Sequence, residues 1–401
     1  MIKKINTDQI KPGMYIHDLN CGWMGHSFLR NSFAVRDDDT IRKIRDTGTN
    51  EVYIDTQKGD DVRDGQTADE VDTSLDQHML EIAAQDQKDA GLVSLTEELP
   101  RARRLHVEAN RIVRNLMEDI RLGKQIELEK VEPLVENVAD SVLRNPSALL
   151  SISLLKNHDT YTFEHSVSVC ALMVAFSREM ELSRDIILQI AVGAMLHDLG
   201  KAKIPDEILN KPGKLTDEEF TAIKEHVNHG AHLLADMQGI TPLELEVVGQ
   251  HHERFDGSGY PQRLAGEEIS LYGQMAAIVD VYDAISSDRV YHKGLSPTVS
   301  LKKILEWSDH HFNRSLVQRF IRSVGIYPPG TLVRLHSGRL GVVIQQAEKN
   351  ILEPLVRVFY HSRQNYYIQP EVVDLSKSQD HVVSCEDYEK WNIDPRQWVS
   401  P

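Results

Sequence analysis

The stretch Ala194-Met195-Leu196-His197-Asp198-Leu199-Gly200-Lys201 predicts the end of a buried helix that delivers an adjacent histidine and aspartate. Apolar residues recur at helical spacing over residues 186–194, and Gly200 is expected to end the helix just before Lys201. A carboxylate can bridge two metal ions while a neutral imidazole binds one, so the pair suits a divalent metal. Helices also end in a polar pair before glycine without binding a metal, so the rest of the chain decides between the two interpretations.

Four further stretches of the helical part of the chain carry histidines or aspartates, at residues 161–165, 226–230, 251–261 and 280–284. A bundle whose successive helices each contribute such a residue can build an internal metal site. Together with the His197-Asp198 pair, these stretches supply five histidines and two aspartates as candidate ligands. These five histidines and two aspartates are enough for two ions, with open positions left for water or substrate.

The composition of the 401-residue chain excludes several classes of function. Its net charge of −16 argues against binding to a nucleic-acid polymer, so an anionic substrate needs local positive charge. No apolar run is long enough to span a membrane, and the N-terminus lacks the form of a signal peptide. Cys21, Cys170 and Cys385 give neither a disulfide framework nor a metal pattern. We therefore expect a cytoplasmic protein without membrane insertion.

The residue patterns predict a mostly α-helical protein with a small β-rich segment at each end. The expected divisions are a β-rich α+β module (1–57), an acidic flexible linker (58–90), a helical connector (91–156), a helical domain (157–325) and an antiparallel β appendage with a loose tail (326–401). Polar residues that can cap helices, such as Ser183, Thr216 and Ser296, mark helix starts in the central part. Alternation with period two indicates the strands after residue 330.

These motifs resemble the HD-GYP family of the HD metal-dependent phosphohydrolase superfamily over residues 155–325. The residues that carry the resemblance are His165, the run His197-Asp198-x-Gly-Lys201, His226, the run His251-His252-Glu253, Gly259-Tyr260-Pro261 and Asp280. Known members hydrolyse cyclic di-GMP, a bacterial second messenger, to pGpG and often onward to GMP. The N-terminal segment is similar to an uncharacterised module that often precedes this domain. The resemblance implies an HD-type helical bundle with a dinuclear metal site and a metal-dependent cyclic di-GMP phosphodiesterase.

The resemblance also assigns roles to individual residues. It implies one ion bound by His165, His197, Asp198 and Asp280, and a second bound by His226, His251 and His252, with Asp198 bridging both. Lys201 and Arg289 would contact the substrate phosphates, as cations close to metal ligands can do. The mixed nitrogen and carboxylate ligands suit iron or manganese. The implied chemistry is attack on phosphorus by a hydroxide that two metals activate.

One position departs from part of the family. Members with three metals carry a glutamate one helical turn before the first histidine, where this sequence has Tyr161. Glu164 is out of phase with that position. We therefore expect a dinuclear site, and pGpG becomes an important or preferred substrate.

The loop with Gly259, Tyr260 and Pro261 has two interpretations. Asp-Gly and Ser-Gly pairs are typical of turns, and a proline stiffens the exit, so the loop can be purely structural. In the family it resembles a surface for GGDEF cyclase domains, so Tyr260 can also contact a partner protein. We expect Glu253 and Asp256 to brace the histidines and the loop, and Asp283 to support a ligand without binding metal.

Three functions fit these residues. The first is hydrolysis of cyclic di-GMP, and the second is hydrolysis of pGpG or another cyclic dinucleotide by the same site. The third is a nucleotide-responsive scaffold that signals through its N-terminal module or the Tyr260 loop. Replacing Asp198 with alanine separates catalyst from scaffold, since a scaffold that does not depend on the metals keeps its partner binding. Both a monomer and an oligomer fit the sequence.

Overall fold

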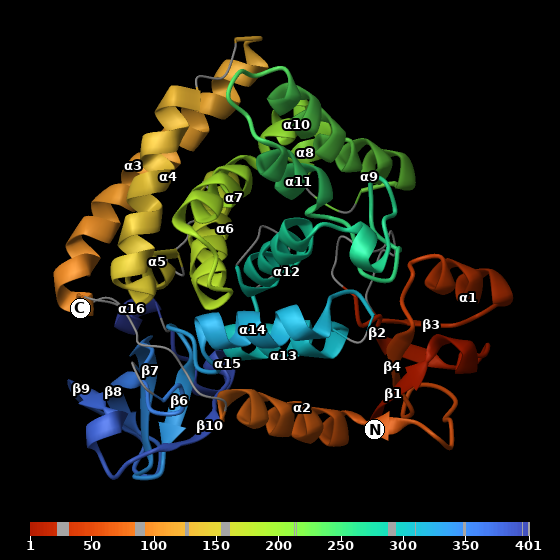
Figure 1. The fold of residues 1–401 in the computed structure, drawn as a ribbon. Coiled ribbons are helices and arrows are strands. Elements are labelled where there is room, and N and C mark those ends of the chain that lie inside the picture. The colour runs from red at the N-terminus through yellow and green to blue at the C-terminus, as the bar shows by residue number, and fades with distance from the viewer. Residues whose placement is uncertain are drawn as a thin grey trace.

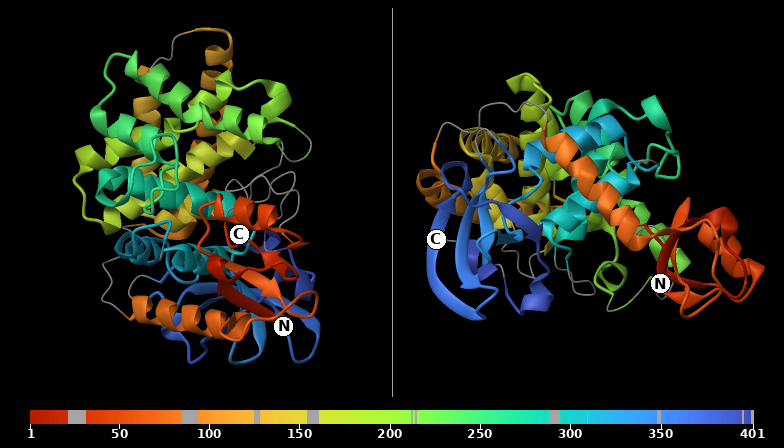
Figure 2. Two further views of the ribbon diagram at one scale, coloured as in Figure 1. Left: turned by 90° about the vertical axis from the view of Figure 1, so that its right-hand side faces the viewer. Right: turned by 90° about the horizontal axis from the view of Figure 1, so that it is seen from below.

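The protein is a helical body flanked by two small antiparallel sheets, as the sequence predicts (Figure 1). The computed structural model describes residues 1–21, 32–84, 93–124, 128–153, 161–211, 213, 215–287, 294–308, 310–347, 350–394 and 396–399. The N-terminal sheet and the C-terminal sheet lie at the same end of the body, and helix α2 (Ala68–Ala83) runs between them (Figure 1 and the right view of Figure 2).

The N-terminal module is a five-stranded sheet with one helix. Its strands are β1 (Ile2–Asn6), β2 (Tyr15–Asp18), β3 (Phe33–Ala34), β4 (Glu51–Asp55) and β5 (Gln66–Thr67), in the antiparallel order β3-β2-β4-β1-β5. Helix α1 (Asp38–Arg45) buries Ile41 and Ile44 against the sheet, because these apolar residues lie three apart on one helix face. The expected β-rich α+β character of this module is confirmed.

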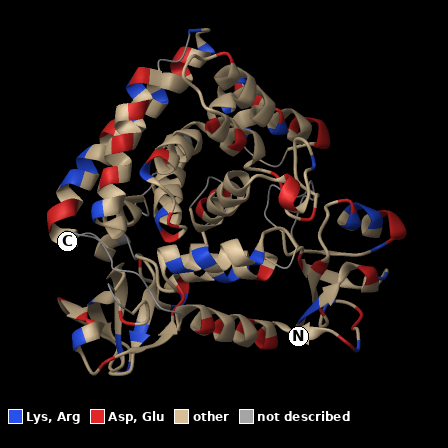
Figure 3. Ribbon diagram, viewed as in Figure 1, with Lys and Arg blue, Asp and Glu red and all other residues tan. Residues whose placement is uncertain are grey.

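The prediction of a flexible linker at 58–90 is wrong for residues 68–83, because these residues form the 16-residue helix α2. Thr67 caps this helix in a capping box with Glu70, and Val71, Met79 and Ile82 are buried. Acidic positions on this helix lie near basic positions of the neighbouring helices in the ribbon (Figure 3). Lys302 contacts the carboxylates of both Asp72 and Asp76 at 2.7 Å. Acidic composition was therefore a poor guide here, because the compensating cation lies far away in the sequence.

The helical body contains one continuous apolar core. Its helices are α3 (Leu95–Arg121), α4 (Leu128–Arg144), α5 (Pro146–Ser153), α6 (Tyr161–Glu179), α7 (Arg184–Leu196), α8 (Asp206–Leu209), α9 (Asp217–Lys224), α10 (His226–Ala235), α11 (Pro242–Gln250), α12 (Leu271–Ser286), α13 (Pro297–Trp307) and α14 (Arg314–Val324). The predicted caps Ser183, Thr216 and Ser296 start α7, α9 and α13. The expected connector helices α3–α5 share the core of α6 and α7, so they form part of the same body. Within the described residues, none of the helices combines the length and the apolar character that crossing a bilayer requires.

The C-terminal appendage is a second antiparallel sheet, in the order β10-β6-β7-β8-β9. Its strands are β6 (Leu332–Leu335), β7 (Arg339–Gln345), β8 (Leu355–His361), β9 (Tyr366–Asp374) and β10 (Val382–Cys385). The prediction of a loose tail is wrong, because the short helices α15 (Tyr388–Trp391) and α16 (Arg396–Val399) cover one face of the sheet. Val399 is buried there, and the Trp398 ring stacks on Phe359 at 4.1 Å.

Glu386 holds this tail on the sheet and makes its stability depend on pH. Burial alone would raise the pKa of Glu386, but hydrogen bonds from Trp391, Ser384 and Arg334 lower it to about 2. The stabilisation is therefore complete above the ordinary pKa of 4.5 and is lost as the pH falls from there toward 2. We expect Glu386→Gln to lower the free energy of unfolding by about 1–3 kcal/mol at pH 7 and to flatten its pH dependence between pH 4.5 and 2. Urea unfolding followed by tryptophan fluorescence measures both, and equal pH slopes in the two proteins would contradict the assignment.

Candidate metal centre

The seven predicted ligands lie together inside the helical body, where five helices meet. They come from α6 (His165), the C-terminal end of α7 (His197 and Asp198), the start of α10 (His226), the end of α11 (His251 and His252) and α12 (Asp280). Their exposed fractions are 1% for His197, Asp198, His226 and His251, 2% for His165 and 3% for Asp280. The His252 side chain is 7% exposed. Such burial of polar side chains requires compensation by another group.

Backbone hydrogen bonds orient three of the histidines. Each donates Nδ1–H to the carbonyl three residues earlier: His197 to Ala194 at 2.8 Å, His226 to Ile223 at 2.7 Å and His251 to Val248 at 2.7 Å. The Nε2 atoms therefore keep their lone pairs and point into the cluster. Each histidine lies next to a helix end, where carbonyls are left without partners in the helix.

The electrostatics keep two of these rings neutral near pH 7. Burial, together with the nearby Lys201 ammonium, lowers the pKa of His226 to about 4. Burial and the neighbouring imidazoles of His197 and His226 lower the pKa of His251 to about 3. Neutral imidazole is the form that binds a metal, so both rings are ready to act as ligands at neutral pH.

The ligand atoms form two groups that share one carboxylate. Atoms of His165, His197 and Asp280 lie within 4.8 Å of one another, and the same holds for His226, His251 and His252. The Oδ2 atom of Asp198 lies 3.6 Å from His165 Nε2 and 3.4 Å from His197 Nε2. Its Oδ1 atom lies 3.5 Å from His226 Nε2, in the other group. Asp198 therefore stands between the groups, where a bridging carboxylate would lie.

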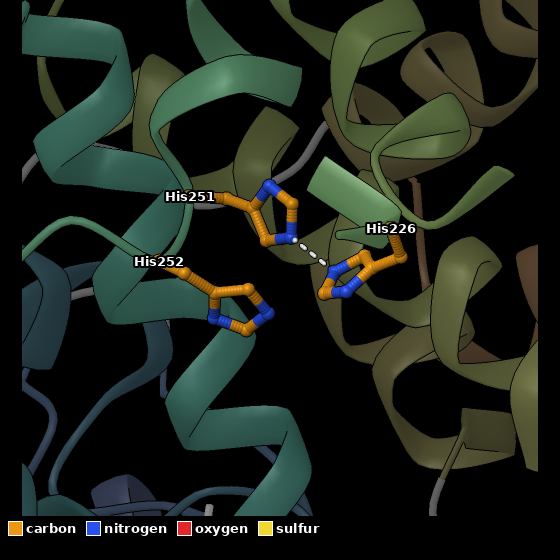
Figure 4. Close-up of side chains that lie close together, drawn as sticks. All are labelled: His226, His251 and His252. Carbon is orange, nitrogen blue, oxygen red and sulfur yellow. Dashed lines mark hydrogen bonds between the residues drawn. The ribbon is translucent and has the colours of Figure 1, made fainter. Parts of the chain in front are cut away.

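Unpaired polar atoms indicate that the cluster could hold cations. Among the described residues, four buried atoms of the cluster have no hydrogen-bond partner: His197 Nε2, Asp198 Oδ1, His252 Nε2 and Asp280 Oδ2. The Nε2 atoms of His226 and His251 are 3.4 Å apart (Figure 4, dashed line). Because both rings donate through Nδ1, this contact brings two lone pairs together and not a donor and an acceptor. A divalent cation between them would satisfy both, so the residues fit a metal centre.

The two carboxylates stay ionised despite their burial. Burial alone would raise the pKa of Asp198, but Lys201 and the adjacent imidazoles hold it well below its usual value. The ammonium of Lys201 lies 2.5 Å from Asp198 Oδ2. Burial alone would also raise the pKa of Asp280. The hydrogen bond from His165 and the nearby His252 outweigh burial and hold this pKa well below its usual value. Both aspartates therefore present charged oxygens to the cluster.

Further residues support the ligands as expected. Asp283 Oδ2 accepts a hydrogen bond of 2.7 Å from His165 Nδ1, which turns Nε2 of that ring toward Asp280 at 2.9 Å. Glu253 is 1% exposed and accepts hydrogen bonds from the backbone N–H groups of Gln262 and Leu264, at 2.7 and 3.1 Å. These bonds fix the loop that carries Tyr260, whose ring packs on His252 with 4.7 Å between the ring centroids.

Some sequence expectations need refinement. The prediction that Gly200 ends the helix is wrong, because α7 ends at Leu196 and Gly200 lies inside the 3-10 helix that follows. A Cβ atom at position 200 would lie 1.9 Å from the carbonyl oxygen of His226. The glycine lets the 3-10 helix Leu199–Lys203 pack directly on α10 and so brings Asp198 to His226. The helix that Thr216 caps, which the sequence suggests would carry His226, ends at Lys224, and His226 starts the next helix, α10. Arg289 and the side chain of Tyr161 fall outside the described residues.

Comparison with known proteins identifies the family of the chain. Residues 150–316 match the model of the HD domain, and residues 2–131 match a domain of unknown function (DUF3391). The chain is 40% identical to a cyclic di-GMP phosphodiesterase of Pseudomonas aeruginosa, over 98% of this chain and 94% of that protein. The chain belongs to the HD-GYP family.

Other relatives match a shorter part of the chain. A cyclic di-GMP phosphodiesterase of Vibrio cholerae is 40% identical over 171 residues, which are 41% of this chain and 35% of that protein. A 3'3'-cGAMP-specific phosphodiesterase of the same organism is 38% identical over 124 residues, 31% of this chain and 24% of that protein.

The close approach at Gly200 leads to a prediction about stability. Gly200→Ala should lower the free energy of unfolding by about 3 kcal/mol or more, because the added carbon meets a rigid backbone carbonyl. The control is Gly249→Ala in α11, where nothing lies within 4 Å of the added carbon. It should be neutral or stabilise by up to about 1 kcal/mol. Urea unfolding of the metal-free proteins measures both changes, and similar effects of the two substitutions would contradict the packing argument.

Proposed function

We propose that this HD-GYP protein is a metal-dependent phosphodiesterase that hydrolyses cyclic di-GMP to pGpG and onward to GMP. The observation that carries the proposal is the pair of inward-facing ligand groups that share Asp198, in a chain that resembles a cyclic di-GMP phosphodiesterase over nearly its whole length. A cytoplasmic location is part of the proposal and fits three free cysteines.

The proposed cofactor is a pair of divalent ions, either iron or manganese. His165, His197 and Asp280 would hold one, His226, His251 and His252 the other, and Asp198 would contribute to both. Bound in this way, the ions would supply a hydroxide nucleophile at neutral pH and offset charge on the phosphoryl group. A set of imidazole nitrogens and carboxylate oxygens suits these metals better than a thiolate-preferring ion.

The side chains of the protein perform the remaining tasks. The backbone-bound histidines keep their Nε2 atoms aimed inward, so little rearrangement is needed at the moment of reaction. Lys201 carries a partly exposed ammonium beside Asp198 and is placed to contact a substrate phosphate. Arg289 is proposed for the same task on the basis of its position in the sequence. These positive groups offset the overall negative charge, which would otherwise repel a nucleotide.

A second candidate is preferential hydrolysis of pGpG or of another cyclic dinucleotide. Tyr161 stands where three-metal members of the family carry a glutamate, and a relative of related sequence is named for 3'3'-cGAMP. The match over almost the full chain favours cyclic di-GMP.

A GGDEF-domain protein is a proposed partner of the loop with Gly259, Tyr260 and Pro261, because that loop characterises the family. A scaffold without turnover is the least favoured alternative, since it has no use for seven converging ligands.

Product analysis tests the proposed function. Protein purified without oxygen and loaded with manganese or ferrous iron should convert cyclic di-GMP to pGpG and GMP. Asp198→Ala should lower kcat/KM by about 100-fold or more, because the proposed bridging ligand is lost. Asp185→Asn, an exposed aspartate at the start of α7, should leave turnover unchanged. Turnover of pGpG alone would favour the second candidate, and no turnover of either nucleotide with both ions bound would refute the enzyme.

Metal affinity tests the role of Asp283. Asp283→Ala should weaken binding of one of the two ions about 10- to 100-fold, because His165 loses the acceptor that orients its ring. Asp283→Asn retains an acceptor oxygen and should lie between this variant and the natural protein. Equilibrium dialysis against manganese measures both dissociation constants, and unchanged affinity in Asp283→Ala would show that His165 does not depend on this contact.

A further inference from the structure

The N-terminal module lies directly against the loop that carries Tyr260. Its contact point is the turn after α1, where Gly48 has a φ of +75°. A Cβ atom on Gly48 would lie 2.7 Å from the Cβ atom of Ser258. Figure 1 shows α1 beside the segment that joins α11 to α12, and the left view of Figure 2 agrees. The loop therefore meets a second structural unit of the same chain.

A short series of contacts joins Ser258 to the centre. Asp256 Oδ1 accepts hydrogen bonds from the N–H and the hydroxyl of Ser258, at 2.9 and 2.6 Å. The N–H of Tyr260 donates to the carbonyl of His252 at 3.1 Å, and its ring packs on the His252 ring. A displacement of Ser258 would therefore move Tyr260, which lies two residues further along the loop, and through Tyr260 the ring of His252.

The module is also fixed to α13, which leads to the other side of the same loop. Glu306 on α13 is 5% exposed and accepts hydrogen bonds from Tyr53 at 2.7 Å and from Asn20 at 3.2 Å. Lys4 lies 3.2 Å from the same carboxylate. A buried carboxylate with partners from another unit is costly to separate, because each partner would be left without its bond.

The residues after α13 complete the second route. His311 Nδ1 lies 3.2 Å from Asp256 Oδ2, and the His311 carbonyl accepts from the N–H of Phe255 at 2.9 Å. The module thus holds the loop directly through Gly48 and indirectly through α13 and His311. Both routes converge on Asp256 and Ser258.

We propose that the N-terminal module positions the Tyr260 loop, with Gly48 and Ser258 as the positioning contact, and thereby sets the place of His252 in the metal centre. The part of this inference that concerns metal rests on the proposed function. The part that concerns the loop stands on the contacts alone. The module is therefore a component of the site, and a change in its packing would alter binding of the ion held by His226, His251 and His252.

The test uses the full chain with Gly48→Ala. In metal-free protein, amide hydrogen exchange of residues 252–264 should become about 5-fold faster or more, because the added carbon displaces Ser258. In metal-loaded protein, one of the two manganese dissociation constants should rise by about 3- to 10-fold, while the other changes less. Gly123→Ala is the matched control, since Gly123 has a φ of +74° and nothing within 4 Å of the added carbon. It should change neither measurement.

A second substitution separates contact from local strain. Adding Ser258→Gly to Gly48→Ala removes the Cβ atom with which the new Cβ atom at position 48 would clash. Exchange in the double variant should therefore return to that of Ser258→Gly alone. Tyr53→Phe removes one hydrogen bond to Glu306 without altering the turn and should also speed exchange in residues 252–264. Unchanged exchange in both Gly48→Ala and Tyr53→Phe would overturn the proposal. If exchange is faster in these variants but the natural protein binds no manganese, the positioning role would be upheld and the metal centre refuted.

Discussion

The carboxylate of Asp198 is the group on which the centre depends. It is 1% exposed, and its two oxygens face histidines that come from different helices. A buried charge is tolerated only when opposite charge or hydrogen bonds surround it, which here means Lys201 and the inward-facing imidazoles. This requirement explains why the turn after α7 must pass so close to α10, and why glycine occupies position 200.

The rest of the fold serves to hold that arrangement. Helices α6, α7 and α12 supply ligands from the middle of a core that continues into α3, α4 and α5. Rigid packing of this kind fixes side chains that would otherwise separate because of repulsion between their lone pairs. Helix α2 joins the N-terminal module to α13 through Lys302. The N-terminal sheet is therefore held close to the body that contains the centre.

Local sequence signals predicted much of this structure. Capping residues gave the starts of α7, α9 and α13, and alternating residues gave the strands of the C-terminal sheet. The order of histidine and aspartate motifs predicted which residues meet at the centre. What the sequence did not reveal depends on partners distant in the chain. Asp72 and Asp76 suggest a flexible linker in the sequence, but in the structure Lys302 lies beside both. The contact of Gly48 with Ser258 likewise has no signal in the local sequence.

Anomalous diffraction from crystals of the manganese-loaded protein tests the central claim most directly. We expect two peaks a few ångströms apart, one bounded by His165, His197 and Asp280 and the other by His226, His251 and His252. The carboxylate of Asp198 should lie between them. A single peak at full occupancy in active protein, or peaks outside this cluster, would contradict a centre in which Asp198 joins two ions.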